Sequence, residues 1–265
     1  MIRIEGLTCG YGSGIVIDNI NLGVRKGEFL GIIGPNGSGK TTILRTITRL
    51  IKPLHGKIYI DDKDINSLSY REMARKVAVV SQNLPVVAMT VKEFVLLGRV
   101  PYHKSLQFFE DDHDLTVAKE AMSMTDTERL KDNYLSGMSG GEVQLASIAR
   151  AIAQEPSLLL LDEPTSHLDI THQVSVLDLI KGFNKKHGLT VIIILHDLNL
   201  ASEYCDRLVL MDQGKIKRAG TSEEVLTYSD IEEVYHTVAV VEKNPLSGKP
   251  FVLVVSEEVK EKCKR

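Results

Sequence analysis

One eight-residue segment limits what this chain can fold into more than any other. Gly34-Pro35-Asn36-Gly37-Ser38-Gly39-Lys40-Thr41 fits the pattern GxxxxGK[ST]. Its glycines allow backbone N–H groups to curl around phosphate groups, and the N-terminus of a following helix adds positive potential. Lys40 can reach β- and γ-phosphates, and the Thr41 hydroxyl can bind Mg²⁺. A Gly-rich turn is the alternative. The apolar run before the segment and the helical stripe after it favour a phosphate-binding loop.

Short apolar runs indicate an α/β core. Phe29–Ile33, Leu158–Leu161 and Val191–Leu195 are each bounded by polar or turn residues, as expected for buried strands of a parallel sheet. Helical stripes of apolar residues separate the runs: one extends from Ile43 to Ile51 and another from Leu145 to Ile152, each followed by a proline. This alternation predicts an α/β fold with a mostly parallel sheet.

Other parts of the chain follow different patterns. Ile2–Ile4, Ile15–Ile17 and Lys57–Ile60 are β-prone and predict an N-terminal antiparallel β subdomain beside the core. Residues from about 88 to 152 become polar and amphipathic, which predicts an inserted α-helical subdomain. We expect one domain at 1–235. The turn pattern Asn244–Gly248 predicts a β-hairpin in a short accessory tail at 236–265.

Two of the apolar runs end in groups suited to chemistry on phosphates. Asp162 and Glu163 follow one run directly, where Asp162 can lie close to a metal and Glu163 can polarise an attacking water. His196 follows another run. Each taken alone has an ordinary structural alternative, an acidic turn or a lone histidine. Ligands of open α/β sheets bind beyond the carboxyl ends of the strands, so the shared position favours a common site.

Composition narrows the classes of function. The formal net charge is −3, which gives no basis for nucleic-acid binding, and no nucleic-acid partner is expected. Cys9, Cys205 and Cys263 are odd in number and widely spaced, as expected of reduced thiols in the cytosol. The apolar runs are far shorter than the roughly 20 residues that span a bilayer, and the N-terminus lacks a signal-peptide pattern. Any membrane role must come through a partner.

A further glycine pair completes a recognisable set. Met138-Ser139-Gly140-Gly141-Glu142 is similar to LSGGQ and precedes a helical stripe, about twenty residues before Asp162. Leu135-Ser136-Gly137 resembles its start but lacks the paired glycines. With the phosphate loop and acidic strand, the set resembles the nucleotide-binding subunit of ABC transporters over nearly all of residues 1–230. Met138 replaces the usual Leu. Leu145 stands where Arg is common in this family, and this difference affects how the helix that follows the glycine pair is anchored.

The resemblance implies a P-loop NTPase core and a composite site for ATP and Mg²⁺. In it, an aromatic residue stacks on adenine, a glutamine touches the metal or water, and Ser166–Asp169 crosses a dimer interface. The implied catalytic residues are Glu163, His196, Gln82 and Lys40. Metal contacts are implied for Thr41, Gln82 and Asp162. Nucleotide contacts are implied for Tyr11, Gly34, Pro35, Asn36, Gly37, Ser38, Gly39, Lys40, Thr41, Thr42, Ser139, Gly140, Gly141 and Glu142.

The resemblance also implies partners. Two copies, or two similar cassettes, would close around two ATP molecules, with integral membrane permease subunits attached and an extracytoplasmic solute-binding protein acting indirectly. The location would be peripheral, at the cytoplasmic face of the membrane. Leu97–Tyr102 resembles the subfamily that imports iron–siderophore, haem and vitamin B12, although an ordinary helix end would look the same. We expect a permease dock within about 85–109, including Phe94, Phe108 and Phe109.

Several alternatives remain open at this stage. The solute could be different, such as a free metal ion. A soluble ATPase acting on DNA or ribosomes would use the same cassette, but coiled-coil arms, tandem cassettes and a basic face are not visible in the sequence. A regulatory module that holds ATP without hydrolysing it is disfavoured by the presence of Glu163 and His196.

Overall fold

The computed structural model describes residues 1–12, 14–82, 88–103 and 110–255. The chain divides into two compact units: unit 1 is Met1–Asp62 with Ile192–Arg265, and unit 2 is Lys63–Val191. The sequence predicts different boundaries: a helical subdomain at about 88–152 and a change from domain to tail at 235/236. The division into two units does not test these boundaries, and they stay predictions. Within the described residues, no helix is long and apolar enough to cross a membrane.

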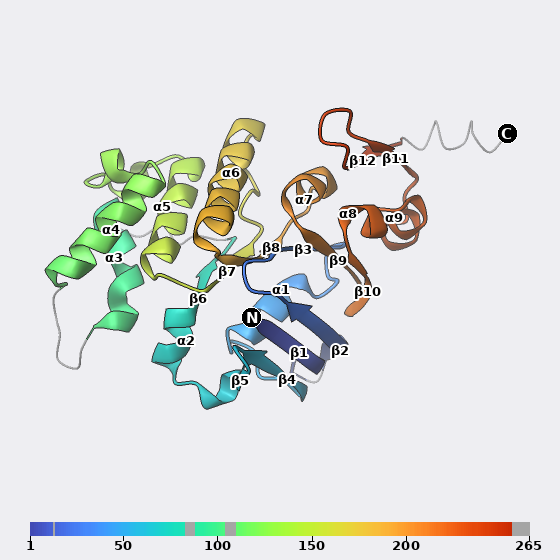
Figure 1. Cartoon of the computed structure of the whole chain (residues 1–265), viewed down its shortest axis with the longest axis horizontal. Helices are drawn as coiled ribbons and strands as arrows, with labels where there is room; N and C mark the ends of the chain where they lie inside the picture. The colour runs from blue at the N-terminus through green and yellow to red at the C-terminus, as the bar shows by residue number, and fades with distance from the viewer. Residues whose placement is uncertain (13, 83–87, 104–109, 256–265) are drawn as a thin grey trace. The chain divides into compact units, whose positions relative to one another are not determined.

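Unit 1 combines strands from both ends of the chain (Figure 1). Its elements are β1 (Ile2–Tyr11), β2 (Gly14–Val24), β3 (Phe29–Ile33), α1 (Lys40–Ile47), β4 (His55–Ile60), the last three residues of β8 (Thr190–Ile194), α7 (Leu198–Tyr204), β9 (Arg207–Asp212), β10 (Lys215–Gly220), α8 (Ser222–Val225), α9 (Tyr228–Tyr235), β11 (Ala239–Lys243) and β12 (Pro250–Val254).

The strands of unit 1 confirm the predicted fold class. β1 pairs in antiparallel register with β2 and β4, which is the N-terminal antiparallel sheet. β3 pairs in parallel with β9, and β10 adds an antiparallel edge to β9. All five residues of β3 are buried. This is expected of a central strand that is covered on both faces, and it explains why the segment is a continuous apolar run.

The helix after the phosphate-binding segment is shorter than the sequence predicts. The apolar stripe runs to Ile51, but α1 ends at Ile47. Arg49 has a φ of 64°, and the backbone N–H groups of Leu50 and Ile51 both donate to the carbonyl of Arg45. The chain therefore turns away from the helix. Ile51 remains buried, whereas Leu50 is 77% exposed, so its predicted place in the stripe is wrong.

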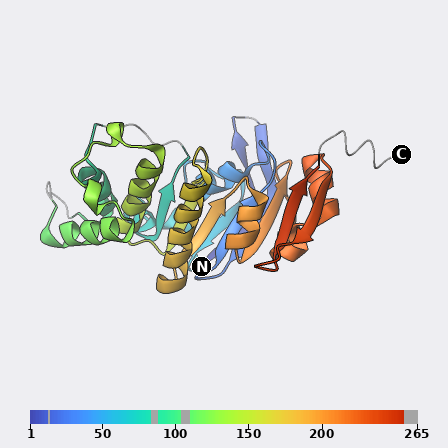
Figure 2. The same cartoon turned by 90° about the horizontal axis from the view of Figure 1, so that it is seen from above.

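The tail of unit 1 contains a hairpin held by α7. β11 and β12 pair in antiparallel register from Ala239↔Val254 to Lys243↔Pro250 (red strands in Figure 2). The Asn199 side chain accepts from the Val252 N–H at 2.7 Å and donates to the Val252 carbonyl at 3.2 Å. The Ser202 hydroxyl donates to the Pro250 carbonyl at 2.8 Å. Side chains of α7 thus replace a missing strand neighbour for β12.

Unit 2 contains a strand pair and a group of helices (Figure 1). β6 and β7 pair in parallel from Val77↔Leu158 to Val80↔Leu161. The elements are β5 (Lys63–Asp64), η1 (Ile65–Ser67), α2 (Tyr70–Lys76), β6 (Val77–Val80), α3 (Val91–Leu96), η2 (Leu97–Tyr102), α4 (Asp112–Met124), η3 (Glu128–Leu130), η4 (Leu135–Gly137), α5 (Gly140–Ala153), β7 (Leu158–Asp162), α6 (Ile170–His187) and the start of β8.

The helices α3, α4 and α5 enclose one apolar cluster. Capping boxes at Thr90/Glu93 and Ser139/Glu142 fix where α3 and α5 begin. Phe94 is only 2% exposed in this cluster, and the Arg150 guanidinium lies 4.7 Å from its ring centroid. The prediction that Phe94 forms part of an exposed dock is therefore wrong, because α3 turns this side chain inward. Phe108 and Phe109 lie outside the described residues.

The segment Leu97–Tyr102 forms η2, and its arginine is buried. Arg99 is 1% exposed. Its Nε donates to Asp114 Oδ1 at 2.9 Å, and its Nη1 donates to the Ala153 carbonyl and to Glu155 Oε2, both at 2.7 Å. A buried guanidinium requires such partners. Arg99 thereby joins η2 to α4 and to the end of α5.

Candidate functional site

In unit 1, the phosphate-binding segment forms a tight loop between β3 and α1. Gly34 has a φ of 147° and Gly39 a φ of 97°. A Cβ at Gly34 would lie 2.2 Å from the Met211 carbonyl oxygen, and one at Gly39 would lie 2.4 Å from Ile17 Cγ2. Both positions therefore require glycine. The exposed Asn36 and Gly37 form the tip of the loop.

Two polar side chains inside this loop fit a bound phosphate group. Lys40 is 5% exposed, and its Nζ donates to the carbonyls of Gly34 at 2.8 Å and Pro35 at 2.9 Å. Ser38 Oγ is buried and has no hydrogen-bond partner among the described residues. A buried hydroxyl without a partner is costly. Phosphate oxygens would satisfy it, and their negative charge would attract the Lys40 ammonium group. Thr41 and Thr42 lie in the first turn of α1 that follows.

The other predicted residues of unit 1 lie at strand ends. Tyr11 is the last residue of β1 and is 50% exposed, and its hydroxyl accepts from Arg45 Nη1 at 3.1 Å. His196 is exposed, two residues after the end of β8. The contact of Arg45 with Tyr11 could not be predicted from the sequence, because the residues around Arg45 give no sign that its side chain reaches β1.

A second unforeseen contact joins α9 to the loop. The Tyr235 phenol is hydrogen-bonded to the backbone of Gly34, and burial raises the pKa of this phenol. The two residues are far apart in the chain, and no motif links them. Helix α9 therefore supports the phosphate-binding loop from the C-terminal part of unit 1.

In unit 2, a carboxylate and two donors meet at the end of β7. Gln82 Nε2 donates to Glu163 Oε2 at 2.7 Å, and Ser166 Oγ donates to the same oxygen at 3.2 Å. Glu163 has a φ of 53°, a left-handed conformation that is uncommon for a residue with a side chain. Asp162 precedes it as the last residue of β7. The structure thus brings together Gln82 and Glu163, which the sequence assigned to one site.

The segment Ser139–Glu142 begins helix α5. Ser139 is the exposed N-cap residue: its Oγ accepts from the Glu142 N–H, and the Glu142 carboxylate accepts from the Ser139 N–H at 3.0 Å. This capping box holds the pKa of Glu142 below its ordinary value. Gly140 is exposed and Gly141 is buried. The similar segment Leu135–Gly137 forms the 3-10 helix η4 instead.

The turn after β7 ends at the N-cap of α6. The Asp169 carboxylate accepts from the His172 N–H at 2.9 Å, and His172 Nδ1 lies 2.9 Å from each carboxylate oxygen. These contacts, the backbone one first, hold the pKa of Asp169 below its ordinary value. Sequence analysis did not single out His172 or Gln173. An Asp followed three residues later by His is the pattern that could have revealed the capped pair.

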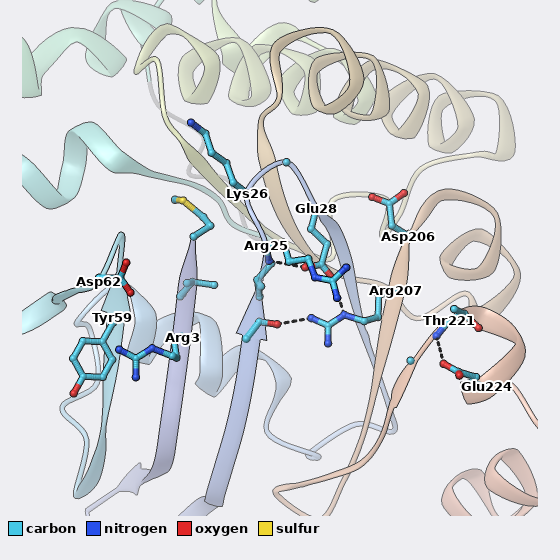
Figure 3. Close-up of a pocket in the computed structure, with 16 residues that line it drawn as sticks. Arg3, Arg25, Lys26, Glu28, Tyr59, Asp62, Asp206, Arg207, Thr221 and Glu224 are labelled. Atoms are coloured by element: carbon cyan, nitrogen blue, oxygen red, sulfur yellow. Dashed lines mark hydrogen bonds and ion pairs between the residues drawn. The ribbon is translucent and has the colours of Figure 1, made fainter.

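Unit 1 also contains a pocket of about 890 Å³ (Figure 3). The pocket contains none of the residues predicted for nucleotide or metal binding. Its lining mixes basic and acidic side chains. Arg207 Nε donates to Glu28 Oε1 at 2.6 Å, and the Arg3 guanidinium lies 4.1 Å from the centroid of the Tyr59 ring. The pocket therefore presents no concentration of one charge.

Comparisons with known proteins agree with this geometry. The family model for ABC transporters matches residues 17–166. The ferric enterobactin transport ATP-binding protein of Escherichia coli (strain K12) is 38% identical over 253 residues, covering 95% of this chain and 93% of that protein. A solved metal-chelate type ABC transporter in an inward-facing conformation contains a chain with a TM-score of 0.85 and 26% identity, covering 97% and 98% of the two chains.

A second solved structure bears on the reaction. It is a dimeric ATP-binding cassette in a post-hydrolysis state, bound to ADP and Pi, with a TM-score of 0.73 and 31% identity over 83% of this chain and 98% of that one. In chain order, this chain has a phosphate-binding loop, a capped second glycine segment and an acidic strand end. The chain belongs to the ABC transporter family, as an ATP-binding and ATP-hydrolysing cassette.

Proposed function

We propose that this chain is the ATPase subunit of an importer that takes up a metal chelate, most specifically an iron–siderophore, and otherwise haem or a cobalamin-type compound. The observation that carries the solute class is the 38% identity to a ferric enterobactin transport protein, because it extends over 95% of the chain. Selection of the solute itself would lie with the membrane and extracytoplasmic partners.

In this proposal the phosphate loop of unit 1 holds the ATP phosphates. Lys40 exchanges its two carbonyl partners for phosphate oxygens, and the Ser38 hydroxyl gains an acceptor. Backbone N–H groups of Gly34–Thr42 and the start of α1 supply further positive potential. Tyr11, oriented by Arg45, stacks on the adenine ring.

Hydrolysis would be the work of residues at strand ends. Glu163 accepts a proton from the attacking water or orients it, while hydrogen bonds from Gln82 and Ser166 hold its carboxylate in place. His196 donates a hydrogen bond to the γ-phosphate. The hydroxyl of Thr41, the carboxylate of Asp162 and the amide oxygen of Gln82 are hard oxygen donors of the type that Mg²⁺ prefers. When bound, Mg²⁺ would neutralise charge on the β- and γ-phosphates.

The site would be completed by a second cassette. Ser139, Gly140, Gly141 and Glu142 at the start of α5 would contact the ATP held by the partner, whether an identical or a similar chain. Support comes from the solved dimeric cassette with ADP and Pi. Closure would be favoured by the γ-phosphate and lost after hydrolysis, which is how the cycle would drive movement in an attached protein.

The attached protein would be an integral membrane permease, with this chain peripheral at the cytoplasmic face of the membrane and a solute-binding protein on the other side. A pull-down of the tagged chain from native membranes, followed by mass spectrometry, tests this assembly. A polytopic permease among the recovered proteins is expected. Recovery only from the soluble fraction, with ribosomes, DNA or no partner, would contradict the importer and leave the ATPase intact.

The solute is tested by uptake in cells that lack the chain. Cells complemented with the native chain should accumulate radiolabelled ferric siderophore, haem or cobalamin, and cells complemented with Glu163→Gln should not. Uptake of free Fe²⁺, Mn²⁺ or Zn²⁺ serves as the comparison. Rescue of free-ion uptake without rescue of any chelate would overturn the solute class while retaining the importer.

A further inference from the structure

We infer that His172 is a positioning residue for the ATPase reaction: its imidazole ring sets the position of Gly141 at the start of α5. A Cβ built on Gly141 would lie 2.8 Å from Cδ2, 3.3 Å from Cγ and 3.4 Å from Nε2 of His172. All three of these nearest atoms belong to one ring. Gly141 and His172 lie near the first turns of α5 and α6, which are both in unit 2 (Figure 1).

The ring is fixed from its other side by Asp169. His172 Nδ1 lies 2.9 Å from each oxygen of this carboxylate, which is itself held as the N-cap acceptor of the His172 N–H. A side chain bound through both its backbone and its ring has little rotational freedom. The edge of the ring that faces Gly141 is therefore presented at a set place.

The same turn leads back to the carboxylate proposed as the base. Gln173 Nε2 donates to the carbonyl of Leu168 at 2.9 Å, which holds the turn onto α6. Ser166 donates to Glu163 from within the turn. The turn therefore carries Ser166, which contacts the carboxylate of Glu163, and Asp169, which holds the ring of His172. Glu163 would act on one ATP, and the α5 segment beside His172 would act on the ATP of the partner cassette. This inference rests on the proposed function, which places Ser139–Glu142 against the partner's nucleotide.

Folding stability does not explain why His172 is paired with Asp169. The His172 and Asp169 side chains are 51% and 65% exposed, and ion pairs so exposed contribute little to folding. The His172 ring occupies the place where a side chain at the buried Gly141 would lie. Its effect should therefore appear in the reaction more than in folding.

The first test compares His172→Ala with the native chain. The expected kcat is about 10-fold lower, as for a misplaced positioning group, while the melting temperature and the affinity for ATP, measured by calorimetry in the Glu163→Gln background, stay unchanged. Ser175→Ala, on the exposed side of the same helix, is the matched control and should keep native activity. Native kcat in His172→Ala would overturn the inference.

A second variant separates the hydrogen bond to Asp169 from the contact between the ring and Gly141. His172→Asn keeps an N–H donor for Asp169 but removes the ring edge that meets Gly141. Its kcat should fall as far as that of His172→Ala, because contact with Gly141 is what positions α5. Full activity in His172→Asn would show that the Asp169 hydrogen bond is sufficient, and would overturn the role of the ring.

A double-mutant cycle with Gly141→Ala completes the test. Because both changes act through one contact, the loss of kcat in Gly141→Ala/His172→Ala should be smaller than the product of the two single losses. Losses that simply multiply would contradict the inference. A native chain that neither hydrolyses ATP nor dimerises with it would instead count against the proposed function, so the two failures are distinguishable.

Discussion

Gln82 Nε2 donates to Glu163 Oε2 across 2.7 Å, although the two residues are 81 positions apart in the chain. The amide fixes the orientation of this carboxylate. A base held in this way needs no reorganisation when the reaction begins, which is the usual source of catalytic advantage in phosphoryl transfer.

Glu163→Gln should abolish most hydrolysis without weakening ATP binding. General-base catalysis contributes about 10²- to 10⁴-fold, so kcat should fall by that factor while the phosphate loop keeps its affinity. Gln82→Ala removes one hydrogen bond to a charged group and should lower kcat by about 10- to 100-fold. Steady-state ATPase assays and calorimetric titration with ATP measure both. A rise in the ATP Kd that matches the loss of kcat would contradict the assigned roles.

Ser38→Ala separates the requirements of folding from those of ligand binding. Ser38 Oγ is buried without a described partner, so its removal should leave the free energy of unfolding unchanged or raise it by up to about 1 kcal/mol. Affinity for ATP should fall, because a hydrogen bond to a charged phosphate is worth about 1.5–3 kcal/mol, or roughly 10- to 100-fold. Chemical unfolding without nucleotide and calorimetry with ATP provide the two values.

The exposed Ser136, in the segment that only resembles a signature, is the control: Ser136→Ala should change neither value. A clear loss of stability in Ser38→Ala would mean that its hydroxyl already has a structural partner, and would remove the argument that it awaits a phosphate oxygen.

Two carboxylates on one guanidinium should differ sharply in their effect on stability. Asp114 is 5% exposed at its side chain beside Arg99, whereas the Glu155 side chain is 51% exposed. Asp114→Asn leaves a buried charge poorly compensated and should cost about 3 kcal/mol or more. Glu155→Gln should cost less than about 1 kcal/mol. Urea unfolding of the two variants measures the difference, and equal losses would contradict the role of burial.

Much of the core could be predicted because its signals are local. Phe29–Ile33 becomes a strand with every residue buried, and α5 begins at the capping box of Ser139, shortly before the apolar stripe that predicts a helix. Both depend on residues within a few positions of one another. Polar residues follow several of the predicted strands, and ligands of open α/β sheets bind beyond the carboxyl ends of the strands, so the sequence predicts one nucleotide site.

The remaining features depend on distant residues. The Tyr235 contact with Gly34 and the Gln82 contact with Glu163 join segments that share no motif. Phe94 looked suitable for an exposed dock until the packing of α3 against α4 and α5 turned it inward. Arg99 reads as a surface cation, and only partners on α4 and after α5 allow its burial.

The capping carboxylate of α5 makes a prediction about pH. Hydrogen bonds from Ser139 lower the pKa of Glu142 in the folded chain, so ionised Glu142 favours folding. This stabilisation is present above the unfolded pKa, about 4.3, and is lost as the pH falls through the lower folded pKa. Glu142→Gln keeps a capping oxygen but carries no charge. Because the side chain is partly exposed, the native chain should exceed the variant by only a few tenths of a kcal/mol at pH 7.

Thermal unfolding of both chains between pH 3 and pH 7, without nucleotide, measures this difference. The gap in melting temperature should narrow as the pH falls through the lowered pKa of Glu142, while the other capping carboxylates titrate equally in both chains and cancel. Glu120→Gln, exposed on α4 and outside any capping box, should show no gap at any pH. A gap for Glu142→Gln that is constant with pH would mean that shape, and not charge, sets the strength of this cap.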